Sequence, residues 1–376
     1  MRTLACNAPY GVGGIGQHFA QLVEESRHAG LLQRYFASPP RTNDPQGQTI
    51  TVPDWQSWLF QYTPVRVVPS WQCYLDNELF DRRLAARLSE SSERFMGFVG
   101  KSLHSFRKAR ALTTSCCCEL VAANSHVENV RRLHEQACRD TQIDDRWLGG
   151  TQLRKTLAEY KEADRIYVHS AYTERSFIDA GIPASMLERT VLTVHPKFQP
   201  PTQRPDDGIF RVVYVGRVEA TKGIPLLMEA FRKMPINAAE LTIVGGWGTR
   251  AMRVYMEEYL AADPRITVAP GDPLPALQRA DVFVHPSYED GFGYAPMEAL
   301  ACGVPVIVTE DTGMKEYVAE EETGYVVPTG SVHALIERLE AVHDRPLATS
   351  ARSFLPASLI GEGPPVPVGG GCSDVS

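Results

Sequence analysis

The stretch DGFGYAPMEALACGVPV, residues 290–306, decides the fold of this chain. Residues 281–285, DVFVH, precede it and have the apolar, β-branched composition of a short buried strand, which Pro286 ends. Residues 295–301 follow as a predicted helix with Pro296 in its first turn, where proline is tolerated. The turn between this strand and this helix therefore faces a crevice at the carboxyl end of the strand.

The glycines and acids around this turn suit a phosphorylated sugar. Gly291 and Gly293 leave the backbone bare, and the first N–H groups of a helix have no intrahelical partner, so a diphosphate can bind there. Because helical side chains lean toward the N-terminus, Glu298 points back at the same ligand, where its carboxylate can accept from both hydroxyls of a ribose. Asp290 can reach the other part of the ligand. Taken alone, these residues also fit a tight turn with an acid that complements the helix dipole.

A second strand end carries two cations. Residues 210–216, FRVVYVG, predict a strand, residues 224–233 predict an amphipathic helix, and Arg217 and Lys222 lie between them. A guanidinium fork and a compact ammonium both suit a diphosphate leaving group that gains negative charge as its bond breaks. Solvated loop charges explain either residue alone equally well, and the combination with residues 290–298 favours a donor site.

Four segments resemble the family 4 glycosyltransferases, which are retaining enzymes of GT-B architecture. The segments are GRVEATKGIPLLMEAF (216–231), LTIVGGWG (241–248), ADVFVHPSYEDGFGYAPMEALACGVPVIVTEDTG (280–313) and GYVVP (324–328), in the order of the family. Weaker likeness extends over residues 163–183 and 11–19. The resemblance implies an α/β fold of two facing Rossmann-like domains with parallel sheets and an interdomain cleft. It also implies transfer of a sugar from a nucleotide-diphosphate donor to an acceptor hydroxyl with retention at the anomeric carbon.

The resemblance assigns roles residue by residue. Arg217 and Lys222 match the pair that holds the donor diphosphate, and Glu298 matches the acid that binds the ribose. Asp290 stands at the first acid of the E-x7-E pattern of the family, a position where glutamate is commoner. The catalytic candidates are therefore Arg217, Lys222, Asp290 and His126, and the donor-binding candidates are Gly14, Gly216, Gly245, Gly291, Phe292, Gly293, Tyr294 and Glu298.

The first half of the chain contributes a glycine-rich loop and one histidine to these candidates. Residues 11–16, which include Gly14, follow a predicted first strand and open a helix, and a bare loop there lets a ligand approach the backbone. A dinucleotide fingerprint and simple close packing are the alternatives. His126 follows the predicted strand 119–123 at its carboxyl end, where contact with substrate and a structural loop role are equally favoured. Strands and helices alternate through this half, which predicts parallel sheets covered by helices.

The predicted organisation has two domains of ordinary size. Residues 1–195 form an N-terminal acceptor-side Rossmann-like domain, and residues 208–344 form a C-terminal nucleotide-sugar-binding Rossmann-like domain. Between them, residues 196–207 contain four prolines and suit a stiff hinge. Residues 345–376 are rich in proline and glycine without a helical period, which predicts a disordered tail where the family usually has helices that cross back onto the first domain.

The amino-acid composition limits which ligands, cofactors and cell compartments we expect for this chain. The net charge is −7 with a pI near 5.8, which offers no general attraction to nucleic acid. The eight cysteines lack zinc-site spacing and are expected to be reduced, and the chain contains no Asp-x-Asp motif, so neither a metal nor another cofactor is expected. The N-terminus lacks a signal-peptide pattern, which predicts a cytoplasmic protein. Basic residues between Lys101 and Arg110 are typical of a solvated helix face, with peripheral contact at the inner face of a membrane as the alternative.

Three other functions remain open at this point. A GT-B sugar-nucleotide epimerase would use the same phosphate and ribose contacts, and a degenerate donor-binding protein would bind without turnover. A nicotinamide dehydrogenase is disfavoured because no acid follows the glycine-rich loop at the expected distance, about 20 residues further on. The acceptor can be a glycan, a lipid-linked sugar or a small molecule, and the sequence does not distinguish them.

Overall fold

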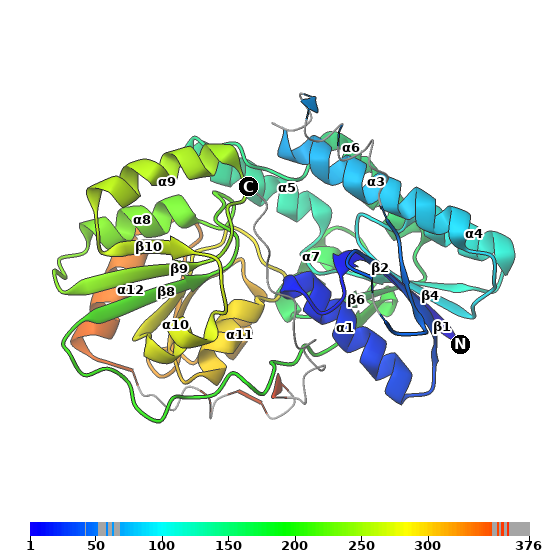
Figure 1. Ribbon diagram of the computed structural model, residues 1–376. Coiled ribbons are helices and arrows are strands. Elements are labelled where there is room, and N and C mark those ends of the chain that lie inside the picture. Colours follow the sequence, from blue (N-terminus) through cyan, green and yellow to red (C-terminus); the bar gives the residue numbers. More distant parts are fainter. Residues whose placement is uncertain are drawn as a thin grey trace.

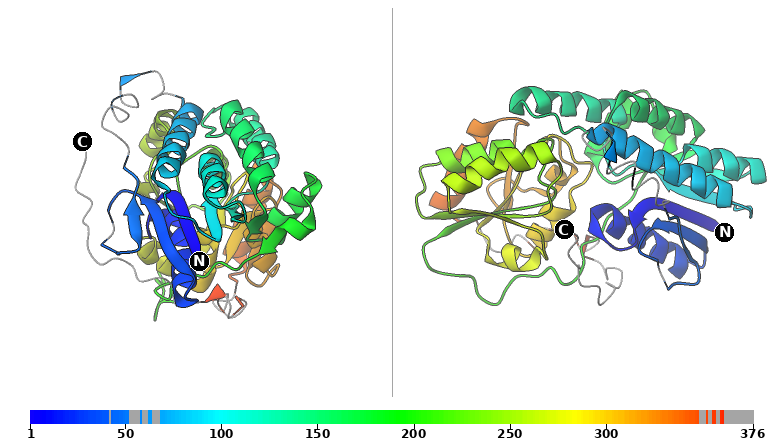
Figure 2. Two further views of the ribbon diagram at one scale, coloured as in Figure 1. Left: turned by 90° about the vertical axis from the view of Figure 1, so that its right-hand side faces the viewer. Right: turned by 45° about the horizontal axis from the view of Figure 1, so that its top comes forward.

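A computed structural model describes the chain except for residues 42, 52–57, 59–61, 64–67, 348–351, 353–354, 357–358 and 361–376. The described residues form two α/β halves, each built on a parallel sheet (Figures 1 and 2). The α/β class and the facing Rossmann-like halves predicted from the sequence are confirmed.

The first sheet has the strand order β3-β2-β1-β4-β5-β6-β7, with every pairing parallel. Its strands are β1 (Arg2–Pro9), β2 (Leu32–Ser38), β3 (Gly47–Thr49), β4 (Arg94–Phe98), β5 (Cys117–Val121), β6 (Arg165–Val168) and β7 (Leu187–Arg189). The helices of this half are α1 (Gly13–His28), α3 (Pro69–Arg87), α4 (Leu103–Leu112), α5 (Val127–Thr141), α6 (Gly150–Glu162) and α7 (Ala171–Asp179), with the 3-10 turn η2 (Ala184–Met186).

The second sheet has the order β10-β9-β8-β11-β12-β13, again parallel. Its strands are β8 (Phe210–Val215), β9 (Ala239–Val244), β10 (Ile266–Ala269), β11 (Val282–His285), β12 (Val306–Thr309) and β13 (Gly324–Val327). Its helices are α8 (Ile224–Lys233), α9 (Arg250–Ala262), α10 (Leu274–Arg279), α11 (Tyr294–Ala301) and α12 (Val332–Asp344), with the 3-10 turn η3 (Gly313–Tyr317). The strand order reverses between β8 and β11, so the loops after these neighbouring strands open a crevice at their carboxyl ends.

One helix of the first half completes the core of the second. Leu133 and Ala137 of α5 are fully buried in the apolar cluster that also contains Tyr214, Val218 and Tyr288. In Figure 1, α5 lies where the two halves meet. The halves therefore share a packed apolar interface and not only a chain connection.

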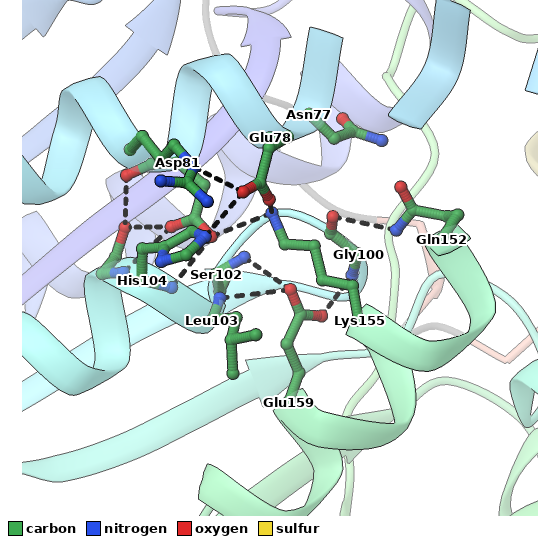
Figure 3. A network of polar contacts seen from close by, with 12 residues as sticks. Asn77, Glu78, Asp81, Gly100, Ser102, Leu103, His104, Gln152, Lys155 and Glu159 are labelled. Atoms are coloured by element: carbon green, nitrogen blue, oxygen red, sulfur yellow. Dashed lines mark hydrogen bonds and ion pairs between the residues drawn. The ribbon is translucent and has the colours of Figure 1, made fainter. Parts of the chain in front are cut away.

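A buried polar network fixes the amino end of α4 (Figure 3). The Glu159 carboxylate accepts from the backbone N–H groups of Gly100, Ser102 and Leu103, and the Asp81 carboxylate accepts from the next two N–H groups along the chain. Lys155 lies 2.9 Å from Glu78 and 3.0 Å from Asp81. Two carboxylates thus satisfy helix-start amides that would otherwise lack partners, and one ammonium offsets their charge.

The described part of the predicted disordered tail is packed, which differs from the expectation for those residues. Leu355 and Leu359 are buried in the apolar core of the second half. Arg352 donates to the carbonyl oxygens of Phe198, in the predicted hinge, and Ala301 at 2.7 and 2.9 Å. The Leu359 carbonyl accepts from the Val194 N–H at 2.8 Å, just before the hinge.

The basic helix face noted in the sequence is partly neutralised. Arg107 lies 2.9 Å from Glu162, and Arg110 lies 2.8 Å from Asp164. These ion pairs account for two of its charges within the first half. Across the residues that the structure describes, no helix is long and apolar enough to cross a bilayer.

Candidate active site

Two candidate residues from distant parts of the sequence form an ion pair at the crevice between β8 and β11. The Lys222 Nζ lies 3.0 Å from Asp290 Oδ2 and 3.2 Å from the Glu289 carbonyl oxygen, to which it donates. The loop that carries Lys222 is pressed against the loop after β11: a Cβ on Gly223 would lie 1.9 Å from the Pro286 carbonyl oxygen. The structure therefore brings Lys222 and Asp290 together, as the predicted donor site requires.

Two aromatic residues that the sequence analysis did not select support this pair. His285, the last residue of β11, places Nε2 3.2 Å from Asp290 Oδ2, and its ring is nearly parallel to that of Tyr214. The Tyr214 hydroxyl donates to the Arg217 carbonyl oxygen at 3.0 Å. Their positions near the carboxyl ends of β11 and β8 are the signal that could have identified them.

Both members of the pair are held in their charged forms. Burial would lower the pKa of Lys222, but the carboxylates of Asp290 and Glu289 outweigh it and raise that pKa. Burial would raise the pKa of Asp290, but Lys222 and His285 outweigh it and lower that pKa. The crevice thus keeps a fixed ammonium group at neutral pH.

Arg217 has partners of its own and stays accessible. Its side chain is 68% exposed, with Nε 2.7 Å from Glu219 Oε1 and Nη2 donating to the Gly248 carbonyl oxygen at 3.4 Å. Gly216 and Gly245 follow the neighbouring strands β8 and β9, and their backbones touch: a Cβ on Gly245 would lie 1.8 Å from the Gly216 carbonyl oxygen. An exposed guanidinium held at the rim of the crevice can turn toward a ligand.

The turn from Gly291 to Tyr294 is fixed on its carbonyl side by the first half of the chain. The Gly291 carbonyl oxygen accepts from the Ser170 and Thr173 hydroxyls at 2.6 and 2.7 Å, and a Cβ on Gly291 would lie 2.3 Å from the Ala123 carbonyl oxygen. Phe292 is buried, and its carbonyl oxygen accepts from the Met314 N–H at 2.7 Å. The close approach of two backbones explains why glycine is needed at residue 291.

The amino end of α11 lacks a side-chain cap. Gly293 stands at the N-cap position with a φ of 99° and no side-chain hydrogen bond. Tyr294 follows, and its ring reaches the first turn of α1, since a Cβ on Gly14 would lie 4.0 Å from Tyr294 Cδ2. Gly14 was expected in a loop before the helix, but α1 already begins at Gly13. The buried Tyr294 hydroxyl has no hydrogen-bond partner within the described chain. Open N–H groups and an unused hydroxyl therefore face the junction between the halves.

Glu298 is a buried acid. Its residue is 7% exposed, and its carboxyl group forms no hydrogen bond within the part of the chain that the structure describes. Burial raises its pKa to about 8, with Lys197 opposing the rise and Asp272 adding to it. A carboxyl group of this kind is protonated at neutral pH until a partner stabilises its charged form.

His126 forms its N–H and side-chain hydrogen bonds within the described chain with Ser176 and Glu128 and not with the other candidates. It is the N-cap of α5, where Nδ1 accepts from the Glu128 N–H, and its buried ring packs against Tyr160 and Phe177. Burial lowers its pKa. It lines a cavity of about 650 Å³ between α5, α7 and η3 that none of the other candidate site residues lines. The contacts of His126 are those of a structural residue.

Glu289 is a further residue that the sequence analysis did not select. It is buried, and its carboxylate accepts from the Asn124 side chain at 2.7 Å and from the Ser125 N–H at 2.8 Å. It therefore joins the loop after β11 to the loop after β5. Among the residues that the structure describes, no three His, Cys, Asp or Glu side chains gather as a metal site, and the seven described cysteines are free.

Comparison with known proteins finds a family match in the second half. Residues 197–353 match the family described as Glycosyl transferases group 1. Over 137 residues the chain is 32% identical to the capsular polysaccharide biosynthesis glycosyltransferase CapM of Staphylococcus aureus. The aligned region covers 35% of this chain and 36% of CapM. A D-inositol 3-phosphate glycosyltransferase of Paenarthrobacter aurescens is 30% identical over 171 residues, covering 40% of this chain and 41% of the relative. The chain thus matches about two fifths of the length of these curated relatives.

Solved structures extend the likeness of fold to the whole chain. Sucrose-phosphate synthase from Thermosynechococcus elongatus superimposes with a TM-score of 0.69 at 21% identity, covering 94% of this chain and 91% of the other. HepE of Anabaena, solved with UDP-glucose, gives a TM-score of 0.66 at 14% identity and covers 96% of each chain. The chain has the GT-B fold.

Proposed function

We propose that the protein is a retaining glycosyltransferase that moves a sugar from a nucleotide-diphosphate donor to an acceptor hydroxyl. The observation that carries this proposal is the Lys222–Asp290 pair, which lies at the reversal of strand order in the half that matches the group 1 glycosyltransferase family. The UDP-glucose complex of HepE, which shares the fold, supports a nucleotide sugar as donor.

The donor diphosphate binds between Lys222, Arg217 and the amino end of α11. An ammonium group has three N–H donors, and Lys222 uses two of them on Asp290 and the Glu289 carbonyl oxygen, so one remains for a phosphate oxygen. Asp290 and His285 hold the ammonium in place. Positioned cations and helix-start N–H groups stabilise the charge that develops on the leaving diphosphate, and each such donor contributes about 10²- to 10³-fold to the rate.

Glu298 receives the ribose. The two ribose hydroxyls donate to its carboxylate and satisfy a buried acid that has no hydrogen bond within the described chain. Because hydrogen bonds to the charged form lower a carboxyl pKa, nucleotide binding releases a proton from Glu298 at neutral pH.

The acceptor approaches from the first half of the chain and attacks on the face from which the diphosphate leaves. The departing phosphate takes the proton of the acceptor hydroxyl, so the anomeric configuration is kept without a protein nucleophile. No metal and no other cofactor takes part in the proposed reaction, because Lys222 and Arg217 supply the positive charge that the diphosphate needs. The acceptor is a glycan, a lipid-linked sugar or a small molecule.

Thermal stabilisation by UDP-, GDP- and ADP-sugars tests the donor site. A ligand at about 100 times its dissociation constant adds about 2.7 kcal/mol to the free energy of unfolding. We expect one of these donors to raise the unfolding temperature of the wild type and of Lys233→Ala, which removes an exposed ammonium from α8. The same donor should leave Lys222→Ala unshifted, and a full shift in that variant would refute the assignment of Lys222.

Product analysis tests the reaction. With the donor that binds, an acceptor screen should yield a glycoside whose anomeric configuration, read by NMR, equals that of the donor sugar. An inverted product would refute retention, and formation of an epimeric donor without acceptor would refute transfer.

A further inference from the structure

Asp145 comes from the first half of the chain and reaches the Arg217–Gly223 loop of the second. It lies between α5 and α6, is 2% exposed, and its Oδ2 accepts from the Ala220 N–H. The Thr221 N–H lies near enough to lower the pKa of this carboxyl group. A single side chain of the first half thus holds the backbone two residues before Lys222.

The loop that Asp145 contacts carries the proposed diphosphate contacts. Glu219 pairs with Arg217 at 2.7 Å, and its carbonyl oxygen accepts from the Lys222 N–H at 3.2 Å. The Thr221 carbonyl oxygen accepts from the Tyr288 N–H at 3.0 Å, which joins this loop to the loop after β11. A displacement of Ala220 and Thr221 would therefore move the backbone from which Lys222 extends.

The burial of Asp145 requires contact between the halves. Oδ1 of this carboxyl group is buried without a hydrogen-bond partner, and burial raises its pKa to about 6, with Glu219 and Asp144 adding to the rise. A buried carboxylate is costly unless it is hydrogen-bonded, and here the amides of the other half supply the bonds. When the halves separate, Asp145 regains water and the loop loses its anchor.

The second donor-binding loop is held from the first half in the same way. Glu289 accepts from Asn124 and Ser125, and the Gly291 carbonyl oxygen accepts from Ser170 and Thr173. Both loops around Lys222 and Asp290 therefore have backbone or carboxylate contacts that exist only while the halves touch.

We propose that Asp145 is a positioning residue that holds the Arg217–Gly223 loop, and with it Lys222, in the conformation that binds a diphosphate. This inference rests on the proposed function. Contact between the halves and diphosphate binding would then be coupled, because each stabilises the same conformation of the Arg217–Gly223 loop.

Hydrogen exchange and nucleotide binding test the inference together in the full chain. Asp145→Ala removes both acceptors, Asp145→Asn keeps one amide oxygen that can accept, and Asp144→Ala removes the neighbouring exposed acid as a control. Exchange is followed by mass spectrometry at residues 216–223 and at β4, and dissociation constants are measured for UDP, GDP and ADP.

We expect the Ala220 amide to exchange about tenfold faster or more in Asp145→Ala, with exchange at β4 unchanged. The affinity for the nucleotide that binds should fall by about tenfold. Asp145→Asn should recover most of both losses, and Asp144→Ala should behave as the wild type. Unchanged exchange at residues 216–223 in Asp145→Ala would overturn the contact, and faster exchange with unchanged affinity would overturn its role in diphosphate binding. A wild type that binds none of the three nucleotides would overturn the proposed function instead, while the exchange data would still decide whether Asp145 anchors the loop.

Discussion

Replacing Glu298 by glutamine should stabilise the empty protein at neutral and alkaline pH and weaken its binding of nucleotides. Burial raises the pKa of Glu298 from its ordinary value of 4.5 to about 8. Between these two values the folded protein keeps a proton that the unfolded chain has released, so this group makes stability fall as the pH rises through that window. Glutamine has a similar shape and no charge to suppress, so it removes this loss.

The expected gain follows from the two pKa values. Linkage gives Glu298→Gln an advantage of about 1 kcal/mol at pH 5, about 3 kcal/mol at pH 7 and about 5 kcal/mol at pH 9. The gain should therefore grow with pH, which a simple change in packing would not produce. The amide has one acceptor oxygen and no charge where the carboxylate has two oxygens and a negative charge, so its hydrogen bonds to the ribose are weaker and nucleotide affinity should fall by about tenfold or more.

Urea unfolding of the wild type and Glu298→Gln at pH 5, 7 and 9 measures the gain, and isothermal titration measures the affinity. Glu322→Gln, at an exposed loop position, serves as the control and should track the wild type at every pH. An advantage of Glu298→Gln that stays constant from pH 5 to pH 9 would refute the reasoning, because it would show that Glu298 is ionised in the empty site. Isothermal titration in buffers of different ionisation enthalpy adds a second check, since the wild type should release a proton on binding and the variant should not.

Three further substitutions test the interface, the buried network and the acid sensitivity. Gly291→Ala should destabilise the protein by about 1–3 kcal/mol and weaken nucleotide binding, because its Cβ would lie 2.3 Å from a carbonyl oxygen of the other half. Gly246→Ala has open space around its Cβ and should leave the unfolding temperature unchanged. Lys155→Met should cost about 3–5 kcal/mol in urea unfolding, because it leaves the buried Asp81 without its cation and Glu78 with Arg82 as the remaining one. Lys161→Met, on the exposed face of α6, should cost less than about 0.5 kcal/mol. When the pH falls from 7 to 5, the wild type should lose up to about 2 kcal/mol more stability than His18→Phe. The reason is that burial keeps the pKa of His18 well below 6.5, while the unfolded chain takes up the proton. Equal losses in both proteins would contradict this explanation.

Local chemistry made much of the second half predictable. The expected helix at residues 224–233 matches α8, and the strands expected at 210–216 and 281–285 correspond to β8 and β11. These elements depend on near neighbours in the chain, such as an apolar periodicity or a proline in a first helical turn, and so a local pattern is sufficient evidence for them.

Contacts between residues far apart in the sequence were harder to predict from the sequence. His126 follows a strand end as a ligand residue would, yet its ring packs in the core beside Tyr160 and Phe177, because helix α6 brings a tyrosine to that position. The described part of the tail packs through Leu355 and Leu359, although a segment rich in proline and glycine predicts disorder. In both cases the partner surface lies far away in the sequence.

The sequence by itself determined the alternation of strands and helices, the glycine-bearing turn before α11, and the presence of two cations and two acids suited to a nucleotide sugar. The tertiary structure decided that Lys222 pairs with Asp290, which is possible only because β8 and β11 are neighbours in the sheet. It also decided that Asp145 and Glu289 join the two halves at the loops that carry Lys222 and Asp290. Hydrogen bonds and ion pairs act over about 3 Å, so which groups meet depends on the packing of whole elements, and no local pattern records that packing.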